Sequence, residues 1–185
     1  MTHDYACFIA LIDRYLVPGF DYPISLLEIQ KLVYFLQEAG EDLSCVDFIK
    51  HHSGPYADVL RPVLEKLEGH FITGYGAGEN TPDTPIHLIP GAADEAVAFL
   101  KKHPETLSRF DRVTQLIEGF ETPLGMELLA TVHWVAAREH AASGPETALR
   151  AIQSWSTSKA KLMSSEQVSA AWGRLADLGW LQPAN

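Results

Sequence analysis

The residues that most directly suggest chemistry in this 185-residue chain are its eight histidines. His51 and His52 are adjacent, so their side chains diverge on a helix or a strand. His133 and His140 are seven residues apart and share a helix face, but no carboxylate completes an H-E-x-x-H zinc motif. A zinc site needs convergent histidine, cysteine or carboxylate ligands. The spacing therefore favours core and surface histidines, and we expect no metal and no cofactor.

Other catalytic patterns are also missing from the sequence. Residues 74–78 (GYGAG) have the composition of a phosphate-binding loop, but such a loop must open a helix. Here the chain continues with ENTPDTP, which favours the flexible tip of a hairpin. Neither Cys7 nor Cys45 lies in a nucleophile motif, and adjacent acids such as Asp94 and Glu95 do not face a common point on a helix. The residues alone show no catalytic constellation.

The net charge of the chain distinguishes nucleic-acid binding from protein binding. The chain has 24 acidic and 14 basic residues, which give a formal net charge of −10. Such a chain repels phosphate backbones, so direct nucleic-acid binding is not expected. Two groups of acids stand out, one at a helix end with the loop after it and one at the junction of two helices: Glu38, Glu41, Asp42 and Asp47, then Glu118, Glu121 and Glu127. They fit either an ordinary solvated surface or a surface that matches a basic groove on a protein partner.

Helical periodicity positions most of these residues. It predicts helices over 3–17, 25–39, 55–68, 92–102, 105–120, 122–140, 145–155 and 164–179, and a short helical turn over 46–50. Ser25 and Glu28 have the spacing of a capping box, as do Ser164 and Gln167. Pro62 lies inside the third pattern and should kink or restart that helix.

A change of pattern interrupts the helices near the middle of the chain. The segments 70–75 and 86–89 are β-branched and aromatic and flank a Gly- and Pro-rich stretch, which predicts a β-hairpin. Hydrophobic residues make up 46% of the chain, enough for a core, so disorder is excluded. We expect a mainly α fold in a single domain over 1–185. Residues 1–90 of this domain are expected to be winged-helix-like, and residues 91–185 are expected to be helical.

Four separated blocks resemble a known family. Residues 29–41, with their K-L-x-Y-F helix, and residues 48–78, with a Gly54-Pro55 turn, resemble the Panacea-type antitoxin domain. Residues 109–136 and 171–181 narrow the resemblance to the C-terminal, toxin-binding domain of DarG-type antitoxins. The blocks occur in the same order and span nearly the whole chain.

The resemblance implies a function by interaction. Such a domain binds and neutralises a DarT-like toxin, which ADP-ribosylates thymidine in single-stranded DNA, by occupying the toxin's DNA cleft as a DNA mimic. The resembled antitoxins also carry a macrodomain that removes ADP-ribose from DNA. This chain is too short to hold a macrodomain beside the resembled domain, so we expect a protein that is not an enzyme.

The implied role selects candidate partner-binding residues. A cleft for single-stranded DNA is positive and offers stacking surfaces, so carboxylates and exposed rings would compete for it. Tyr34, Tyr56, Tyr75 and Trp155 are the aromatic residues expected at the surface. The candidate partner-binding set is Tyr34, His51, His52, Tyr56, Tyr75, Glu118, Glu121 and Glu127.

A second function class stays open. Helices followed by a hairpin are also typical of winged-helix DNA-binding regulators, with the hairpin as the wing. The charge of the candidate recognition helix 55–68 opposes DNA binding, since its two basic residues are outnumbered by three acids, Asp58, Glu65 and Glu68. The longest apolar stretch, 128–137, is too short to cross a bilayer. The two cysteines are expected to be buried reduced thiols, so we expect a cytoplasmic protein without a membrane partner.

Overall fold

The computed structural model describes residues 1–16, 23–43, 46–76 and 81–181. They form two compact units: Met1–Ile49 with Ala57–Gln115 (unit 1), and Lys50–Tyr56 with Leu116–Asn185 (unit 2). The expectation of one domain, with a winged-helix-like segment 1–90 and a helical segment 91–185, stays a prediction. Cys45, in the predicted loop after the second helix, and Gly78, in the glycine-rich stretch, lie outside the described residues.

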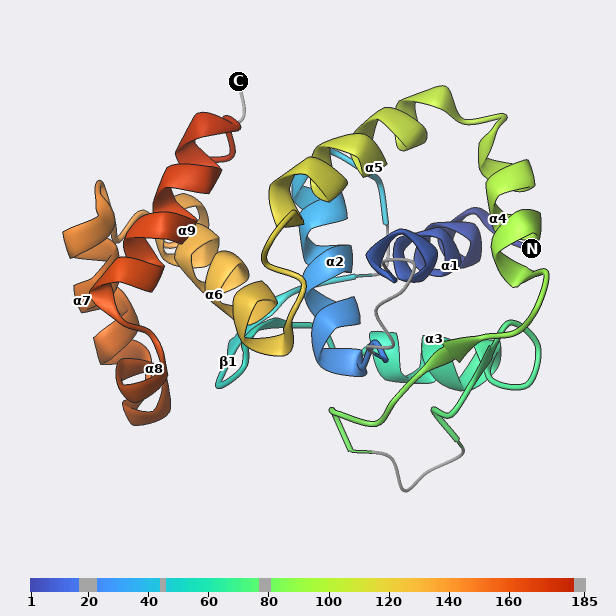
Figure 1. Cartoon of the computed structure of the whole chain (residues 1–185), viewed down its shortest axis with the longest axis horizontal. Coiled ribbons are helices and arrows are strands. Elements are labelled where there is room, and N and C mark those ends of the chain that lie inside the picture. Colours follow the sequence, from blue (N-terminus) through green and yellow to red (C-terminus); the bar gives the residue numbers. More distant parts are fainter. Residues whose placement is uncertain (17–22, 44–45, 77–80, 182–185) are drawn as a thin grey trace. The chain divides into compact units, whose positions relative to one another are not determined.

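Helices dominate the described residues, so the prediction of a mainly α fold is confirmed (Figure 1). The helices are α1 (His3–Tyr15), α2 (Leu26–Glu38), α3 (Leu60–Leu67), α4 (Ala92–Leu100), α5 (Pro104–Ile117), α6 (Pro123–His133), a π-helical turn η1 (Trp134–Arg138), α7 (Pro145–Trp155), α8 (Thr157–Leu162) and α9 (Ser165–Asp177). The strands are β1 (Ile49–His51), β2 (Gly54–Tyr56), β3 (Ile72–Thr73) and β4 (His87–Leu88), in two small sheets.

Unit 1 is organised around α1, which packs against α4 and α2. The first turn of α1 is fixed by Thr2, whose hydroxyl accepts a hydrogen bond from the Tyr5 amide at 3.2 Å. The predicted capping box at α2 is present, since the Ser25 amide donates to the Glu28 carboxylate at 3.1 Å. Burial raises the pKa of this Glu28 above its ordinary value, against the opposing effect of those hydrogen bonds.

The predicted hairpin is present in unit 1 but is short. β3 pairs with β4 in antiparallel register, with Ile72 opposite Leu88 and Thr73 opposite His87. Gly74 follows β3 with a φ of 98°, and a Cβ there would lie 2.4 Å from the Pro85 carbonyl oxygen. Only glycine fits this close approach of two backbones.

Two of the expected helical segments differ clearly from the structure, for local reasons. The helix expected over 55–68 begins at Leu60, because Gly54 to Tyr56 form β2. Pro62 then lies in the first turn of α3, where its missing N–H has no intrahelical partner to lose. No kink results. The helical turn expected over 46–50 is also wrong, since Ile49 begins β1.

Unit 2 is built on α6, which packs against α9, α7 and β2 (Figure 1). The predicted cap at Thr122 is present: its hydroxyl accepts a hydrogen bond from the Gly125 amide at 2.9 Å. His133, at the end of α6, is buried and donates from Nε2 to the Trp180 carbonyl oxygen at 3.1 Å. Trp180 therefore folds back onto the core, as predicted. The short helix α8 was not expected from the sequence.

Replacing Gly125 with alanine is expected to lower the free energy of unfolding by about 1–2 kcal/mol, because overpacking forces backbone shifts. A Cβ at Gly125 would lie 2.5 Å from the Phe120 carbonyl oxygen. Gly173→Ala is the matched control. Gly173 also lies within a helix, α9, but a Cβ there would have no described atom within 4 Å. That change should stabilise by up to about 1 kcal/mol through helix propensity. Urea unfolding of both variants checks the opposite signs.

Among the residues that the structure describes, no helix has the length and apolar character needed to cross a membrane. A cytoplasmic location stays a prediction.

Candidate functional site

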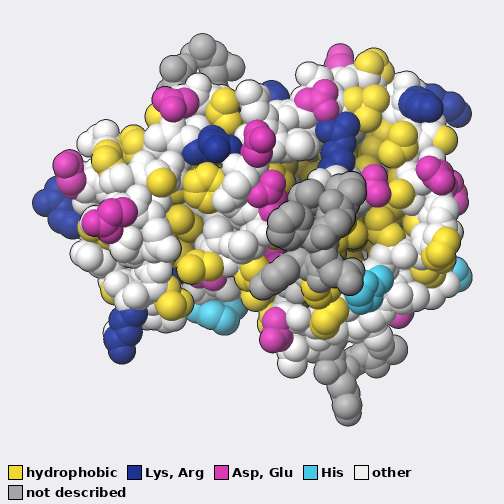
Figure 2. Space-filling view, viewed as in Figure 1, with side chains coloured by type: hydrophobic (Ala, Val, Ile, Leu, Met, Phe, Trp, Pro, Cys, Tyr) yellow, Lys and Arg dark blue, Asp and Glu magenta, His cyan; other side chains and the backbone are white. Residues whose placement is uncertain are grey.

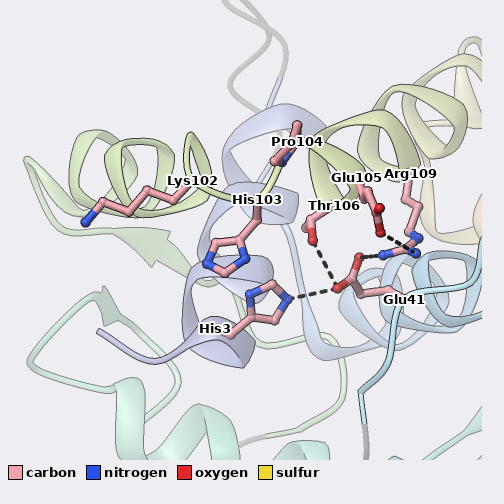
Figure 3. Close-up of a pocket in the computed structure, with 8 residues that line it drawn as sticks. All are labelled: His3, Glu41, Lys102, His103, Pro104, Glu105, Thr106 and Arg109. Atoms are coloured by element: carbon pink, nitrogen blue, oxygen red, sulfur yellow. Dashed lines mark hydrogen bonds and ion pairs between the residues drawn. The ribbon is translucent and has the colours of Figure 1, made fainter.

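A polar pocket in unit 1 is the candidate site (Figure 3). Its volume is about 370 Å³, within the range of small-molecule sites, and it is open to solvent. The lining residues come from the start of α1, the loop after α2, and the α4–α5 junction with the first turns of α5: His3, Glu41, Lys102, His103, Pro104, Glu105, Thr106 and Arg109. Segments far apart in the sequence thus meet at one place.

Glu41 is the centre of the pocket's hydrogen bonds (Figure 3). Its Oε1 accepts from His3 Nε2 at 2.8 Å and from Thr106 Oγ1 at 3.1 Å. Its Oε2 accepts from Arg109 Nη1 at 2.9 Å. Arg109 also lies 3.7 Å from the exposed Glu105 carboxylate, one turn earlier on α5. Both carboxylate oxygens of Glu41 are therefore held in fixed directions.

The local sequence explains this convergence. Gly40 ends α2, as predicted, and Glu41 follows it directly. Pro104 begins α5, where a proline is well tolerated. Thr106 and Arg109 are three residues apart on α5, so their side chains share one face of that helix.

Glu41 is an ionised carboxylate at neutral pH. Burial by itself would raise its pKa, but the hydrogen bonds from His3, Arg109 and Thr106, together with the charge of Arg109, outweigh burial and lower the pKa below its ordinary value. A group with a lowered pKa stabilises the fold above its unfolded-state pKa and loses this effect as the pH falls towards the folded-state value. The cluster should therefore weaken only in acid.

Cys7 and His103 extend the cluster around His3. Cys7, one turn after His3 on α1, is fully buried, and its Sγ lies 3.6 Å from His3 Nε2. Burial raises the pKa of this thiol to about 12, with the charges of Glu41 and Asp4 adding to the effect. The His103 ring packs edge-on against the His3 ring, with 4.8 Å between centroids. The pocket can thus offer an ionised carboxylate, two imidazoles and a guanidinium to a ligand.

The aromatic residues expected at the surface are mostly buried. Tyr34, Tyr56 and Tyr75 have exposed fractions of 0%, 6% and 2%, so these rings offer little area for stacking on a partner. Trp155 is half-buried, and its indole N–H donates to the His51 carbonyl oxygen at 3.0 Å. Tyr34 lies on α2, Tyr56 lies in β2 and Tyr75 follows β3, and the sequence pattern did not show which face of each segment is buried.

The other candidates lie in unit 2. The His51 ring stacks on Tyr56, with 4.7 Å between centroids, and lies tilted against the His52 ring at 3.9 Å. Glu118 is exposed, and its neighbour Glu121 accepts a hydrogen bond from the Gly119 amide at 2.6 Å. The carboxylate of Glu127 pairs with Lys159. Their role in partner binding stays a prediction.

Acidic side chains do not gather into one patch on the face drawn in Figure 2. They are scattered among neutral and basic side chains there. Among the acids singled out in the sequence, Glu41 converges with other reactive groups in a pocket. The sequence reasoning missed its partners His3, Thr106 and Arg109, and also His103, whose ring packs against His3. The four-residue spacing of His3 and Cys7 on one helix face could have drawn attention to His3.

Comparison with known proteins finds relatives of similar sequence. No protein-family model matches the chain. A protein of Thermus aquaticus is 44% identical over 161 residues, which cover 87% of this chain and 43% of that protein. Proteins of Mycobacterium bovis and Mycobacterium tuberculosis are 39% identical over 157 residues, which cover 82% of this chain and 44% of each. All three are named DNA ADP-ribosyl glycohydrolase.

The chain is similar to DNA ADP-ribosyl glycohydrolases. It spans less than half the length of these curated relatives. Their shared name is that of a hydrolase. The predictions of a DarG-type antitoxin domain, of toxin neutralisation as its function and of a chain that is not an enzyme are therefore wrong. The alternative of a winged-helix regulator is not what these names indicate either. The protein partner expected with that resemblance stays an untested prediction.

The wrong prediction of function has two causes. The four sequence blocks suggested a resemblance over nearly the whole chain, but a resemblance does not by itself assign an activity. Because the sequence shows no catalytic motif, the chain was predicted not to be an enzyme. Motif searches by spacing miss a cluster such as His3, Glu41 and Arg109, in which the two partners of Glu41 are 38 and 68 residues away from it.

Proposed function

We propose that this chain acts in the removal of ADP-ribose from DNA. The observation that carries the proposal is its similarity to proteins named DNA ADP-ribosyl glycohydrolase, at 44% identity over 87% of the chain for one of them. Because the chain spans less than half of those proteins, the proposal concerns the share of the activity that this chain contributes. We assign that share to the pocket around Glu41.

The chemistry of the pocket suits hydrolysis of a glycosidic bond. Such reactions pass through an oxocarbenium-like transition state, which a nearby carboxylate stabilises. Glu41 is ionised and rigidly held, as this role requires. A histidine is the usual side chain for transferring the accompanying proton, and His3 and His103 both line the pocket.

Charged groups of the pocket also match the anionic moiety of the substrate. Arginine is suited to bind phosphate oxygens through paired N–H groups. Arg109 offers such a group from within the pocket, and Lys102 lies at its rim, with its ammonium pointing away from Glu41 (Figure 3). These local cations are needed because the net charge of −10 repels DNA as a whole.

An assay on modified DNA tests the proposal. The purified chain is incubated with a single-stranded oligonucleotide that carries ADP-ribose, and released ADP-ribose is measured by mass spectrometry. We expect release by the chain and at least a tenfold lower rate for Glu41→Gln, since this variant keeps the shape but removes the negative charge. Glu65→Gln is the matched control, because Glu65 is an exposed glutamate of α3 outside the pocket lining. Its rate should equal that of the wild type.

A full-length curated relative, assayed on the same oligonucleotide, makes a negative result decisive. If the relative releases ADP-ribose and this chain does not, the activity lies in the portion of the relative that this chain does not match, and the proposal is overturned. If the chain is active and Glu41→Gln retains the wild-type rate, the assignment to the pocket is overturned.

A further inference from the structure

We propose that His3, Cys7 and Glu41 form a binding site for a transition-metal ion, with Zn²⁺ as the ion that fits best. The three side chains bring an imidazole nitrogen, a thiol sulfur and a carboxylate oxygen together, all within 4.8 Å of one another. These are the three ligand types of protein zinc sites. The metal site is inferred from this geometry alone, and a bound ion would occupy His3 and Glu41, the residues to which the proposed hydrolysis assigns proton transfer and charge stabilisation.

One of the distances between the ligand atoms matches a tetrahedral ion, and a second needs a small adjustment. With Zn–N and Zn–S bonds of about 2.05 Å and 2.3 Å, a tetrahedral angle puts nitrogen and sulfur about 3.6 Å apart. His3 Nε2 and Cys7 Sγ are 3.6 Å apart. The same construction puts nitrogen and carboxylate oxygen about 3.4 Å apart, whereas His3 Nε2 and Glu41 Oε1 are hydrogen-bonded at 2.8 Å. An ion therefore replaces that hydrogen bond and needs an adjustment of about half an ångström.

The backbone of α1 places two of the ligands, His3 and Cys7, next to each other. His3 is the first residue of α1 and Cys7 lies four residues later, so their side chains share one face of the helix. The hydrogen bond between the Thr2 hydroxyl and the Tyr5 amide fixes this first turn. Two ligands on one regular element need little ordering when the ion binds.

The surroundings of Glu41 orient the third ligand. Arg109 holds Oε2 at 2.9 Å, and Thr106 donates to Oε1 at 3.1 Å. Hydrogen bonds of this kind orient ligating carboxylates around metal ions, and their loss typically lowers metal affinity. The carboxylate can therefore bind an ion through Oε1 while Oε2 stays on Arg109.

The choice of metal follows from the donors and the charges. A thiolate ligand excludes Mg²⁺ and Ca²⁺, which prefer oxygen, and favours Zn²⁺ and similar ions. The Cys7 thiol loses its proton to the solvent on binding, and thiolate and Glu41 carboxylate then balance the two positive charges of the ion. Arg109 opposes binding by its own charge, so a moderate affinity is expected and not that of a zinc finger.

Three protein ligands leave a fourth position open. His3 and Glu41 both line the pocket, so this position faces the pocket and its solvent. Zinc sites with three protein ligands and one open position are typical of catalytic sites, whereas structural sites are closed by four. The His103 ring lies against His3 and is the nearest further imidazole to the cluster.

Metal binding to the purified full chain tests the site. The chain is stripped with a chelator and then titrated with Zn²⁺ or Co²⁺ alone. We expect one ion per chain after dialysis, measured by mass spectrometry, and a Co²⁺ absorption spectrum with tetrahedral bands and a thiolate charge-transfer band. Cys7→Ala should lose the thiolate band and bind at least tenfold more weakly. Cys45→Ser is the matched control and should retain both properties.

A second variant protects the test against a folding defect. His3→Asn changes a partly exposed residue at the helix start, and it should also weaken binding at least tenfold while circular dichroism stays that of the wild type. Binding of one ion with equal affinity by the wild type, Cys7→Ala and His3→Asn would place the ion elsewhere and overturn the proposal. Binding of less than one tenth of an equivalent by the wild type would overturn it as well.

Discussion

Replacing Lys159 with alanine is expected to lower the free energy of unfolding by about 2–4 kcal/mol. Lys159 lies in α8 with an exposed fraction of 1%, and its ammonium pairs with the Glu127 carboxylate and donates to Thr131 Oγ1 at 3.3 Å. The ammonium also lies 5.1 Å from the centre of the Trp155 ring. Burial lowers the pKa of Lys159, while Glu127 acts against this shift. Alanine removes the charge, the packed stem and the partner of Glu127 together.

Two further lysine variants separate these contributions in urea unfolding. Lys161→Ala is the matched control, because Lys161 is exposed on the same short helix, and its loss should stay below about 0.5 kcal/mol. Lys159→Met keeps most of the stem and removes the charge, so it should recover at least half of the loss. Equal stability of Lys159→Ala and Lys161→Ala would show that the buried pair does not stabilise unit 2.

The elements that could be predicted from the sequence are those with local causes. Capping boxes at Ser25 and Ser164 and the cap at Thr122 act over three residues, and all three occur where the pattern indicates. The hairpin also follows from its own residues, since its two strands are neighbours in the sequence and flank the Gly- and Pro-rich stretch. Such features depend on backbone groups that neighbouring side chains satisfy.

The buried polar groups could not be predicted in this way. Lys159 follows a serine-rich segment that is typical of a surface, yet the fold buries it beside Glu127, 32 residues away. The pocket around Glu41 depends on contacts across 38 and 68 residues. A sequence pattern shows which face of a helix is apolar, but not which polar group the packed fold encloses. The candidate site therefore became visible only when distant elements were placed together.

The prediction of function failed for a similar reason. The resemblance in residues 29–41 and 109–136 was assigned to an antitoxin domain, and both this assignment and the function taken from it were wrong. The relatives found by comparison are named as glycohydrolases. Relatedness is carried by the many residues that form the core, whereas an activity is carried by a few side chains whose geometry the sequence does not display.

Acidification is expected to destabilise unit 2 through His133. Burial lowers the pKa of His133 from 6.5 to about 4, an effect that the hydrogen bond to the Trp180 carbonyl opposes and the charge of Arg138 supports. The unfolded chain therefore takes up a proton near pH 6.5, but the folded chain does so only near pH 4. Between these values the unfolded state binds more protons, so the stability falls as the pH falls. The expected loss between pH 7 and pH 4.5 is about 2–3 kcal/mol.

Other groups also titrate in this range, so the measurement is a difference between variants. His133→Gln cannot become charged, and its amide can still donate to the Trp180 carbonyl; whatever stability it loses is lost equally at both pH values. Urea unfolding at pH 7 and 4.5 should therefore show the wild type losing about 2–3 kcal/mol more than His133→Gln. His140→Asn is the matched control: His140 is exposed with a φ of 51°, a conformation that asparagine tolerates, so this variant should follow the wild type. Parallel losses in the wild type and His133→Gln would mean that His133 is not held neutral by the fold.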